Sequence, residues 1–135
     1  IDRVLSPPTT ETRLDARYRK NVNGNVTYTV GGNASHLQYH KADEFGLESG
    51  RDFRDVIGVF GQLKAKLARN VLLRVEGSYD WETGTRRESL ARLEAALEWK
   101  YGLLDFSIEG RYDVFEEESS TGSESTILFT ARRRF

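Results

Sequence analysis

The stretch Val71–Trp81, VLLRVEGSYDW, alternates between two kinds of residue. Its odd positions are apolar, aromatic or small and read Val71, Leu73, Val75, Gly77, Tyr79 and Trp81. Its even positions are mostly charged or polar and read Leu72, Arg74, Glu76, Ser78 and Asp80. Because successive side chains of a β-strand point to opposite faces, this period of two predicts a strand with one apolar and one polar face.

The same alternation extends along most of the chain. It is clear in residues 57–68, 89–101 and 104–114, and weaker in a first hairpin around residues 14–30. A bulge in 31–33, Gly-Gly-Asn, is expected to change the facing register before Leu37 and Tyr39. Seven strands are therefore predicted, near residues 11–20, 25–40, 52–68, 71–82, 86–101, 103–116 and 125–135.

Residues 89–102, SLARLEAALEWKYG, require a choice between helix and strand. The segment is built of good helix formers, and three of its leucines have helical spacing. On a helix, however, Ala91 and Trp99 would lie off the apolar stripe, whereas on a strand every odd position is apolar or small. The neighbouring segments are clear strands with tight connections, so we predict a strand here as well.

The predicted connections alternate in length. Short turns are expected near residues 21–24, 69–70 and 101–102, and longer polar loops at 41–51, 82–85 and 117–124. In an up-and-down meander, this places the short turns at one end of the strands and the long loops at the other. Residues 1–10 are expected to be an irregular segment or the end of a preceding strand or loop, and residues 11–135 to form the meander.

Composition limits the possible functions of the 135-residue chain. With 20 basic and 21 acidic residues, it has no basic field that would indicate nucleic-acid binding. The absence of cysteine excludes a disulfide framework, a thiolate metal site and a cysteine nucleophile. The polar average does not exclude a membrane β-barrel, because such a barrel places its apolar residues at every second position.

The polar positions of the predicted strands carry charges of both signs. A dense mixture of charge fits a water-filled lumen or a solvated exterior equally well. The charged residues predicted to face a lumen are Lys64, Lys66, Arg74, Glu76, Asp80, Arg92, Glu94, Glu98, Lys100, Glu109, Arg111 and Asp113.

The aromatic residues of the apolar positions lie near the strand ends, with aliphatic residues and glycine between them. Two aromatic bands about 25 Å apart are typical of strands that span a bilayer. Tyrosine and tryptophan prefer the headgroup level because their rings have an apolar body and a polar tip. The predicted girdle consists of Tyr79, Trp81 and Tyr112 at the loop end, and of Trp99, Tyr101 and Phe135 at the turn end.

Residues 127–135, ILFTARRRF, resemble the C-terminal signal of Gram-negative outer-membrane β-barrels, in which the last strand alternates apolar residues and ends in Phe. Arg133 departs from this pattern, since an aromatic or apolar residue is commoner there. The resemblance implies a porin-like barrel in outer-membrane lipid, recognised by the barrel-assembly machinery, with long loops extracellular and the C-terminus periplasmic. The residues that match the signal are Ile127, Phe129, Ala131 and Phe135.

The fold class predicted from these features is all-β, an antiparallel up-and-down transmembrane β-barrel or barrel segment with seven to eight strands. Seven strands conflict with the even number usual in bacterial barrels. Residues 1–5 could supply an eighth strand, several copies could share one barrel, or the chain could be the C-terminal part of a larger barrel. Since the chain contains no methionine and Pro7–Pro8 suits a spanning strand poorly, we expect the larger barrel.

No catalytic or metal site is predicted. His36 and His40 would share a strand face but lie about 13 Å apart, too far to bind one ion. The acidic residues of 43–48 and 116–124 are interpreted as solvated loop residues. No constellation of Ser, His and Asp and no phosphate-binding glycine loop is recognisable, so we predict neither enzymatic activity nor a cofactor. The charges of Arg132–Arg134 are interpreted as luminal and interfacial.

Three functions fit this reading. The first is an outer-membrane barrel that acts as a porin-like conduit, or as an export barrel or housing for cargo or another chain. The second is a soluble β-barrel or meander that binds an apolar ligand or self-associates through strand edges. The third is a surface scaffold or adhesion barrel that uses its long loops.

Overall fold

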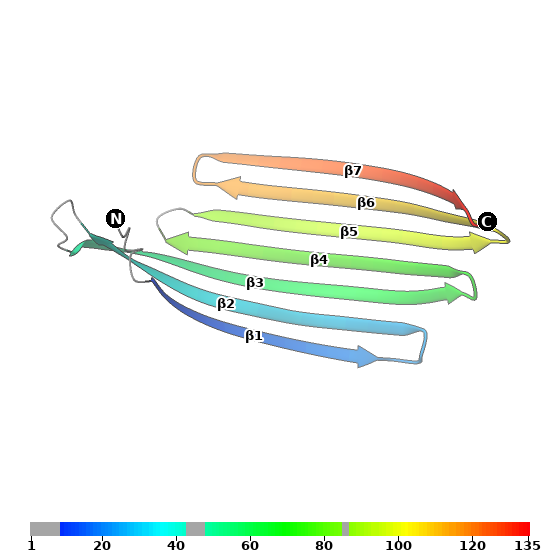
Figure 1. The fold of residues 1–135 in the computed structure, drawn as a ribbon, viewed down its shortest axis with the longest axis horizontal. Helices are drawn as coiled ribbons and strands as arrows, with labels where there is room; N and C mark the ends of the chain where they lie inside the picture. Colours follow the sequence, from blue (N-terminus) through cyan, green and yellow to red (C-terminus); the bar gives the residue numbers. More distant parts are fainter. Residues whose placement is uncertain (1–8, 43–47, 85–86) are drawn as a thin grey trace, which may run out of the picture.

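The structure, a computed structural model, describes residues 9–42, 48–84 and 87–135. These residues form one antiparallel sheet of seven strands that follow one another in sequence order, without a helix (Figure 1). The predicted up-and-down meander is confirmed. The strands are β1 (Thr9–Asn21), β2 (Val26–Ala42), β3 (Glu48–Ala68), β4 (Val71–Gly84), β5 (Glu88–Tyr101), β6 (Leu104–Glu117) and β7 (Ser120–Arg133).

The segment with mixed helix and strand signals is strand β5. It pairs along its whole length with β6, from Glu88 opposite Glu117 to Tyr101 opposite Leu104. On its other side it pairs with β4. Tertiary pairing on both edges therefore overrides the local helix propensity of this sequence.

The predicted bulge in residues 31–33 is wrong. The β1–β2 pairs run without a register shift from Thr9 opposite Tyr39 to Asn21 opposite Thr27. The β2–β3 pairs also pass Gly31 without a register shift. Register shifts occur elsewhere, at Lys41/Ala42 and at Lys66/Ala68. Leu37 therefore occupies the same face of the backbone as Gly31 and not the opposite one. The side chain of Tyr39 lies outside the described residues.

The predicted long loop at residues 117–124 is also wrong. Strand β6 continues to Glu117 and β7 begins at Ser120, so only Glu118 and Ser119 connect them. The Ser, Thr and Gly residues that indicated a loop pair with β6, because the backbone groups of β6 need partners along its full length. Of the other two predicted loops, the first includes residues 43–47 and the second includes residue 85, which lie outside the described residues.

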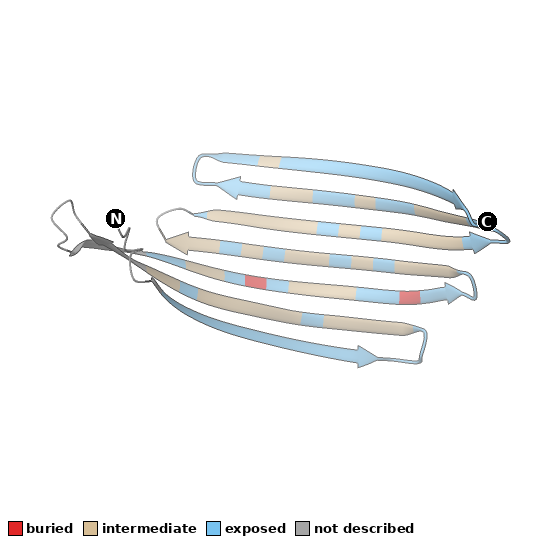
Figure 2. Ribbon diagram, in the orientation of Figure 1, coloured by how far each residue is buried: buried red, intermediate tan, exposed pale blue. Residues whose placement is uncertain are grey.

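The sheet is open and consists of one layer. Strands β1 and β7 form its two edges and do not pair with each other, so the described strands do not close into a barrel. With an odd number of antiparallel strands the two edges run in the same direction, as Figure 1 shows, and cannot join as an antiparallel pair. Among the described residues only Gly58 and Ala65, both on β3, are buried (Figure 2).

The strand ends are staggered across the sheet. At the turn end, which contains the β1–β2, β3–β4 and β5–β6 hairpins, each hairpin extends further than the one before it (Figure 1). Through the successive pairings, Asn21 lies in line with Arg74, three residues inside the Val71 end of β4. The β5–β6 hairpin continues two residues past Trp99, the partner of Val71. The ends therefore advance by five residues over four strand spacings.

Candidate functional site

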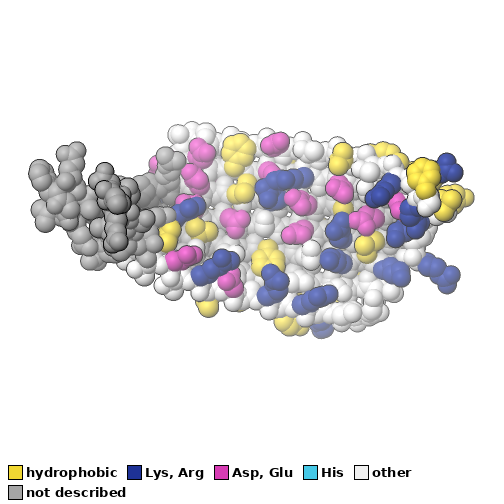
Figure 3. Space-filling view, viewed as in Figure 1, with side chains coloured by type: hydrophobic (Ala, Val, Ile, Leu, Met, Phe, Trp, Pro, Cys, Tyr) yellow, Lys and Arg dark blue, Asp and Glu magenta, His cyan; other side chains and the backbone are white. Residues whose placement is uncertain are grey.

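The sheet pairing sorts the side chains into two faces. All twelve charged residues predicted to face a lumen lie on one face, which we call the polar face; it also carries Arg17 of β1 and Phe60 of β3. The opposite, apolar face carries the odd-numbered residues of β4 and β5. Figure 3 views the molecule from the side where charged side chains dominate.

Ion pairs connect neighbouring strands across the polar face. The carboxylate of Asp113 accepts hydrogen bonds from Arg92 Nε on β5 and from Arg111 Nε on its own strand, each at 2.9 Å. The Asp113 side chain is only 13% exposed, which makes this the most enclosed ion pair of the face. Further pairs between strands are Arg54–Glu82, Arg74–Glu98 and Arg111–Glu94.

A platform of three residues lies across β1, β2 and β3. Arg17, Gly31 and Phe60 occupy directly opposite positions in one row of the sheet. Gly31 has no side chain, and the Phe60 ring fills the vacant position: a Cβ at Gly31 would lie 2.5 Å from Phe60 Cζ. The Arg17 guanidinium lies 5.3 Å from the centre of the same ring, within the range of a cation–π interaction.

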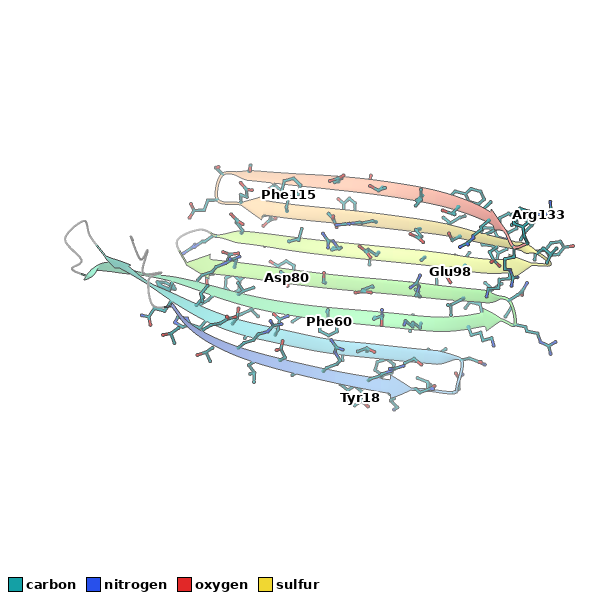
Figure 4. All side chains as sticks on the ribbon, in the orientation of Figure 1. Tyr18, Phe60, Asp80, Glu98, Phe115 and Arg133 are labelled. Atoms are coloured by element: carbon teal, nitrogen blue, oxygen red, sulfur yellow. The ribbon has the colours of Figure 1, made fainter. Side chains whose placement is uncertain are left out.

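A phenylalanine ring also covers a glycine on the neighbouring strand at the other edge of the sheet. Gly122 on β7 is opposite Phe115 on β6, and a Cβ at Gly122 would lie 2.2 Å from Phe115 Cζ. Figure 4 labels both Phe60 and Phe115. Aromatic rings that cover glycine on a neighbouring strand protect the exposed backbone and fix the strand register. The two phenylalanines on the polar face are therefore structural partners of glycine.

The charged residues of the polar face that make no ion pair are unevenly distributed along the strands. Cations predominate near the turn end, and carboxylates predominate near the loop end. At the turn end and beside it, six cations on the polar face have no ion-pair partner among the described residues: Arg17, Arg19, Lys64, Lys66, Lys100 and Arg132. At the opposite, loop end the carboxylates without such a partner are Glu11, Asp80, Glu88, Glu117 and Glu118. Glu124 lies in the same row of the sheet as Arg17, on the opposite edge strand. Exceptions to this separation are Arg87 at the loop end and Glu76 and Glu109 nearer the turn end. In Figure 3 acidic side chains are more frequent toward the left and basic ones toward the right, with both signs mixed in the middle.

The apolar face is exposed and its aromatic residues cluster. Trp99 stacks on Phe106 with ring centres 5.2 Å apart, and Phe129 lies 6.4 Å from both rings. This cluster lies at the turn end, together with Tyr101 of the predicted girdle. The other girdle residues Tyr79, Trp81 and Tyr112 occupy the same face toward the loop end, and Phe135 follows β7 with its side chain fully exposed.

A polar pair interrupts the apolar face near the loop end. His36 Nδ1 and Asp55 Oδ1 are in hydrogen-bond contact between β2 and β3, with Thr12 and Thr83 in the same row. The expected bulge would have turned this part of β2 over, so the sequence did not indicate the pairing. The side chain of His40 lies outside the described residues.

The matched residues of the C-terminal signal share the apolar face. Ile127, Phe129 and Ala131 lie opposite apolar-face residues of β6, and Arg133 lies opposite Leu104. The Arg133 guanidinium is 5.6 Å from the centre of the Phe135 ring. The residue that departs from the signal therefore contacts the aromatic residue that ends it.

The predicted lumen-facing set was incomplete. It omitted Arg17, Arg19 and the Arg13–Asp15 ion pair of β1, and Arg54 of β3. The alternation of residues 11–20 could have placed the β1 charges on the polar face. The pair Arg54–Glu82 needed the strand register, because its partners are separated by 28 residues.

Comparison with known proteins provides no relative. No protein-family profile, curated protein or solved structure matches the chain. In the part of the chain that the structure describes, no helix has the length and apolarity needed to span a membrane. Among the same residues, no group of three or more His, Cys, Asp or Glu side chains is arranged to hold a metal ion.

Proposed function

We propose that the chain forms part of the wall of an outer-membrane β-barrel, with the apolar face toward lipid and the polar face toward an aqueous lumen. The barrel serves as a porin-like conduit or as an export barrel or housing for cargo. The observation that carries this proposal is an apolar face of large exposed side chains, bounded by aromatic residues, on a sheet whose opposite face is charged.

The exposure of the apolar face supports a lipid environment. Leu93, Ile108 and Ile127 are 51%, 41% and 82% exposed, although they lie on the apolar face. A soluble monomer seldom exposes so continuous an apolar surface, because removing it from water is favourable. Lipid tails would cover it without a second protein layer.

The stagger of the strands supports a tilted barrel wall. Five residues correspond to about 17 Å along a strand, and four strand spacings to about 19 Å across the sheet. If the turn-end hairpins lie at one membrane surface, the strands tilt by about 40°. Closed barrels require a tilt of about 35–45° with a fixed register stagger.

The length of the apolar band agrees with the same tilt. On β4, the apolar face is uninterrupted by polar residues from Val71 to Trp81. Eleven residues tilted by about 40° cover about 25 Å of membrane thickness, which matches the apolar band of outer-membrane barrels. On β4 the polar row of His36 and Asp55 reaches Thr83, two residues past Trp81, where this strand would leave the lipid.

The direction of the edge strands favours a larger barrel over an assembly of copies. β1 and β7 run in the same direction, so antiparallel closure needs an odd number of further strands between them. If two copies in the same orientation formed one barrel, β7 of each copy would lie beside β1 of the other, and both pairs would be parallel. We therefore propose that the remaining strands, odd in number, belong to another part of the same barrel.

The two alternative functions, a soluble barrel and an adhesion barrel, have less support from the structure. A soluble barrel requires the apolar face to turn inward. Two hollows of about 370 and 320 Å³ are instead lined mainly by polar-face side chains, although a third of about 680 Å³ at the loop end includes Tyr79 and Trp81 of the apolar face. The adhesion hypothesis relies on long loops, and the one predicted at residues 117–124 is absent, because Glu118 and Ser119 alone join β6 and β7.

Quenching of tryptophan fluorescence by brominated lipids tests the proposal. The protein that contains this chain is folded into lipid vesicles, and the difference between wild type and W99F isolates the emission of Trp99; W81F isolates Trp81. We expect strong quenching of both by bromine near the headgroups and weaker quenching by bromine at the bilayer centre. Quenching by aqueous iodide but by neither lipid would overturn the lipid-facing assignment.

A further inference from the structure

We propose that the polar face binds an anionic ligand in a hollow near the turn end, formed around Arg17, Arg19, Lys64 and Phe60. The ligand carries at least two oxyanion groups, either carboxylates or phosphates. That the ligand is cargo of a conduit rests on the proposed function, whereas the binding itself rests on the geometry of the hollow.

The hollow has the size and lining of a small-ligand site. Its volume is about 320 Å³, and the cationic side chains of β1 and β3 line it together with the half-buried Thr27 and Thr29 of β2. Threonine hydroxyls can donate hydrogen bonds to an oxyanion. Arginine and lysine supply the charge, and arginine can bind a carboxylate or phosphate through two parallel hydrogen bonds.

The cations of the hollow lack carboxylate partners. Elsewhere on the polar face Arg74, Arg92 and Arg111 each reach a carboxylate, whereas Arg19 and Lys64 reach none among the described residues. The carboxylate of Glu76 also lines the hollow, where it accepts a hydrogen bond from Gln62 Nε2 at 3.0 Å, but the three cations outnumber its single negative charge. An incoming anion would therefore meet cations whose charge is not already neutralised by a neighbour.

The platform beneath the hollow holds one cation in place. Phe60 is fixed over Gly31, and the Arg17 guanidinium lies against the Phe60 ring. A cation ordered before binding loses less side-chain entropy when the ligand arrives. Arg17 thus provides a preorganised position for the first oxyanion.

The spacing of the cations indicates more than one oxyanion. Arg17 and Arg19 are two residues apart on β1, about 7 Å, and Lys64 lies two strands away, about 10 Å. A single carboxylate would have to draw three long side chains from two strands together to contact all of them. A pyrophosphate or a chain of acidic sugars can place separate anionic groups against them.

The charge at the other end of the polar face confines the anion to the turn end. The carboxylates of the loop end that make no ion pair among the described residues, such as Glu88 and Glu117, oppose an anion there by like-charge repulsion. The separation of charge in Figure 3 therefore favours entry and binding of anions at the basic end.

Calorimetric titration of the protein in neutral detergent micelles tests the inference with two probes, pyrophosphate and trigalacturonate. The test variant is R19Q/K64Q, which removes two cations of the hollow. The matched control is K20Q/R87Q, which removes the same charge from the apolar face of β1 and from the loop end. Losing charge-assisted hydrogen bonds should weaken binding by about tenfold or more in R19Q/K64Q and leave it unchanged in K20Q/R87Q.

The two probes separate the sources of the oxyanion. Binding of pyrophosphate alone identifies phosphate as the recognised group, and binding of trigalacturonate alone identifies an acidic saccharide; either result with the expected variant pattern supports the inference. Absence of binding to both probes, or equal weakening in both double variants, overturns it. Bromolipid quenching of Trp99 in lipid vesicles tests the proposed function independently, so failure of one does not imply failure of the other.

Discussion

The Phe60 ring on β3 lies in the space that a side chain on Gly31 of β2 would occupy. A Cβ at position 31 would be 2.5 Å from Phe60 Cζ and 2.7 Å from the backbone oxygen of Ala16. Glycine is therefore required by close packing on two sides, and its presence does not indicate an irregular strand. The ring in turn supports Arg17, so one glycine position connects strand packing to the charged hollow.

The first prediction concerns this glycine. Gly31→Val should destabilise the protein by about 1–3 kcal/mol, because the ring and the neighbouring strand must both shift. Gly110→Val is the control, since nothing lies within 4 Å of a Cβ built there. The measurement is the denaturant dependence of unfolding in vesicles. Adding Phe60→Ala to Gly31→Val should recover part of the loss, and equal effects of the two valine variants would refute the packing argument.

The second prediction concerns the carboxylate that two arginines share. Asp113→Asn should lower the denaturant midpoint, because Arg92 and Arg111 lose a common charged acceptor. Glu109→Gln on the same strand and face is the control, since Glu109 makes no ion pair among the described residues. Added salt should reduce the difference between wild type and Asp113→Asn. If both variants shift the midpoint equally, the shared ion pair contributes nothing specific.

The strands and their faces could be predicted because the period-two alternation is a local signal. Residues 71–81 alone define one strand and both of its faces, and the same pattern resolves the ambiguity at 89–102. The placement of twelve charged residues on one face followed from this alternation, since each strand was read separately.

The errors arose where the deciding partner is distant in the sequence. Gly31 suggested a bulge, but the ring that explains it belongs to the next strand. Residues 120–124 read as a loop, yet β6 provides the backbone groups that make them a strand. The pairing of His36 with Asp55 and the separation of unpaired charges likewise depend on register between strands, which local composition does not contain.

The third prediction compares two leucines on opposite faces. Leu93 on the apolar face and Leu128 on the polar face are 51% and 54% exposed. Leu93→Arg should cost about 2–4 kcal/mol in a bilayer, because it places a charge against lipid. Leu128→Arg should cost little, since Leu128 is opposite Glu109, which can pair with the new cation.

Folding free energies of these two variants in vesicles check the assignment of the faces. Similar exposure of the two leucines removes the loss of buried area as an explanation for any difference. A larger penalty for Leu128→Arg than for Leu93→Arg would show that the faces are assigned the wrong way round.

The last prediction concerns the C-terminal residue and its neighbour. The Phe135 side chain is fully exposed, and the Arg133 guanidinium lies 5.6 Å from its ring. Because the ring is not packed into the sheet, Phe135→Ala should leave the denaturant midpoint of the refolded protein nearly unchanged.

Assembly in cells should respond differently from stability. If the terminus is the assembly signal that it resembles, Phe135→Ala should reduce the folded protein in the outer membrane several-fold, and Arg133→Phe, which restores the commoner pattern, should raise it. Arg132→Gln, on the polar face next to the signal, serves as the control and should change neither quantity. Folded protein is measured by its altered mobility in unheated gel samples of the membrane fraction. Normal assembly of Phe135→Ala would show that the terminus is not read as a signal, whereas a parallel loss of stability would assign the residue a structural role instead.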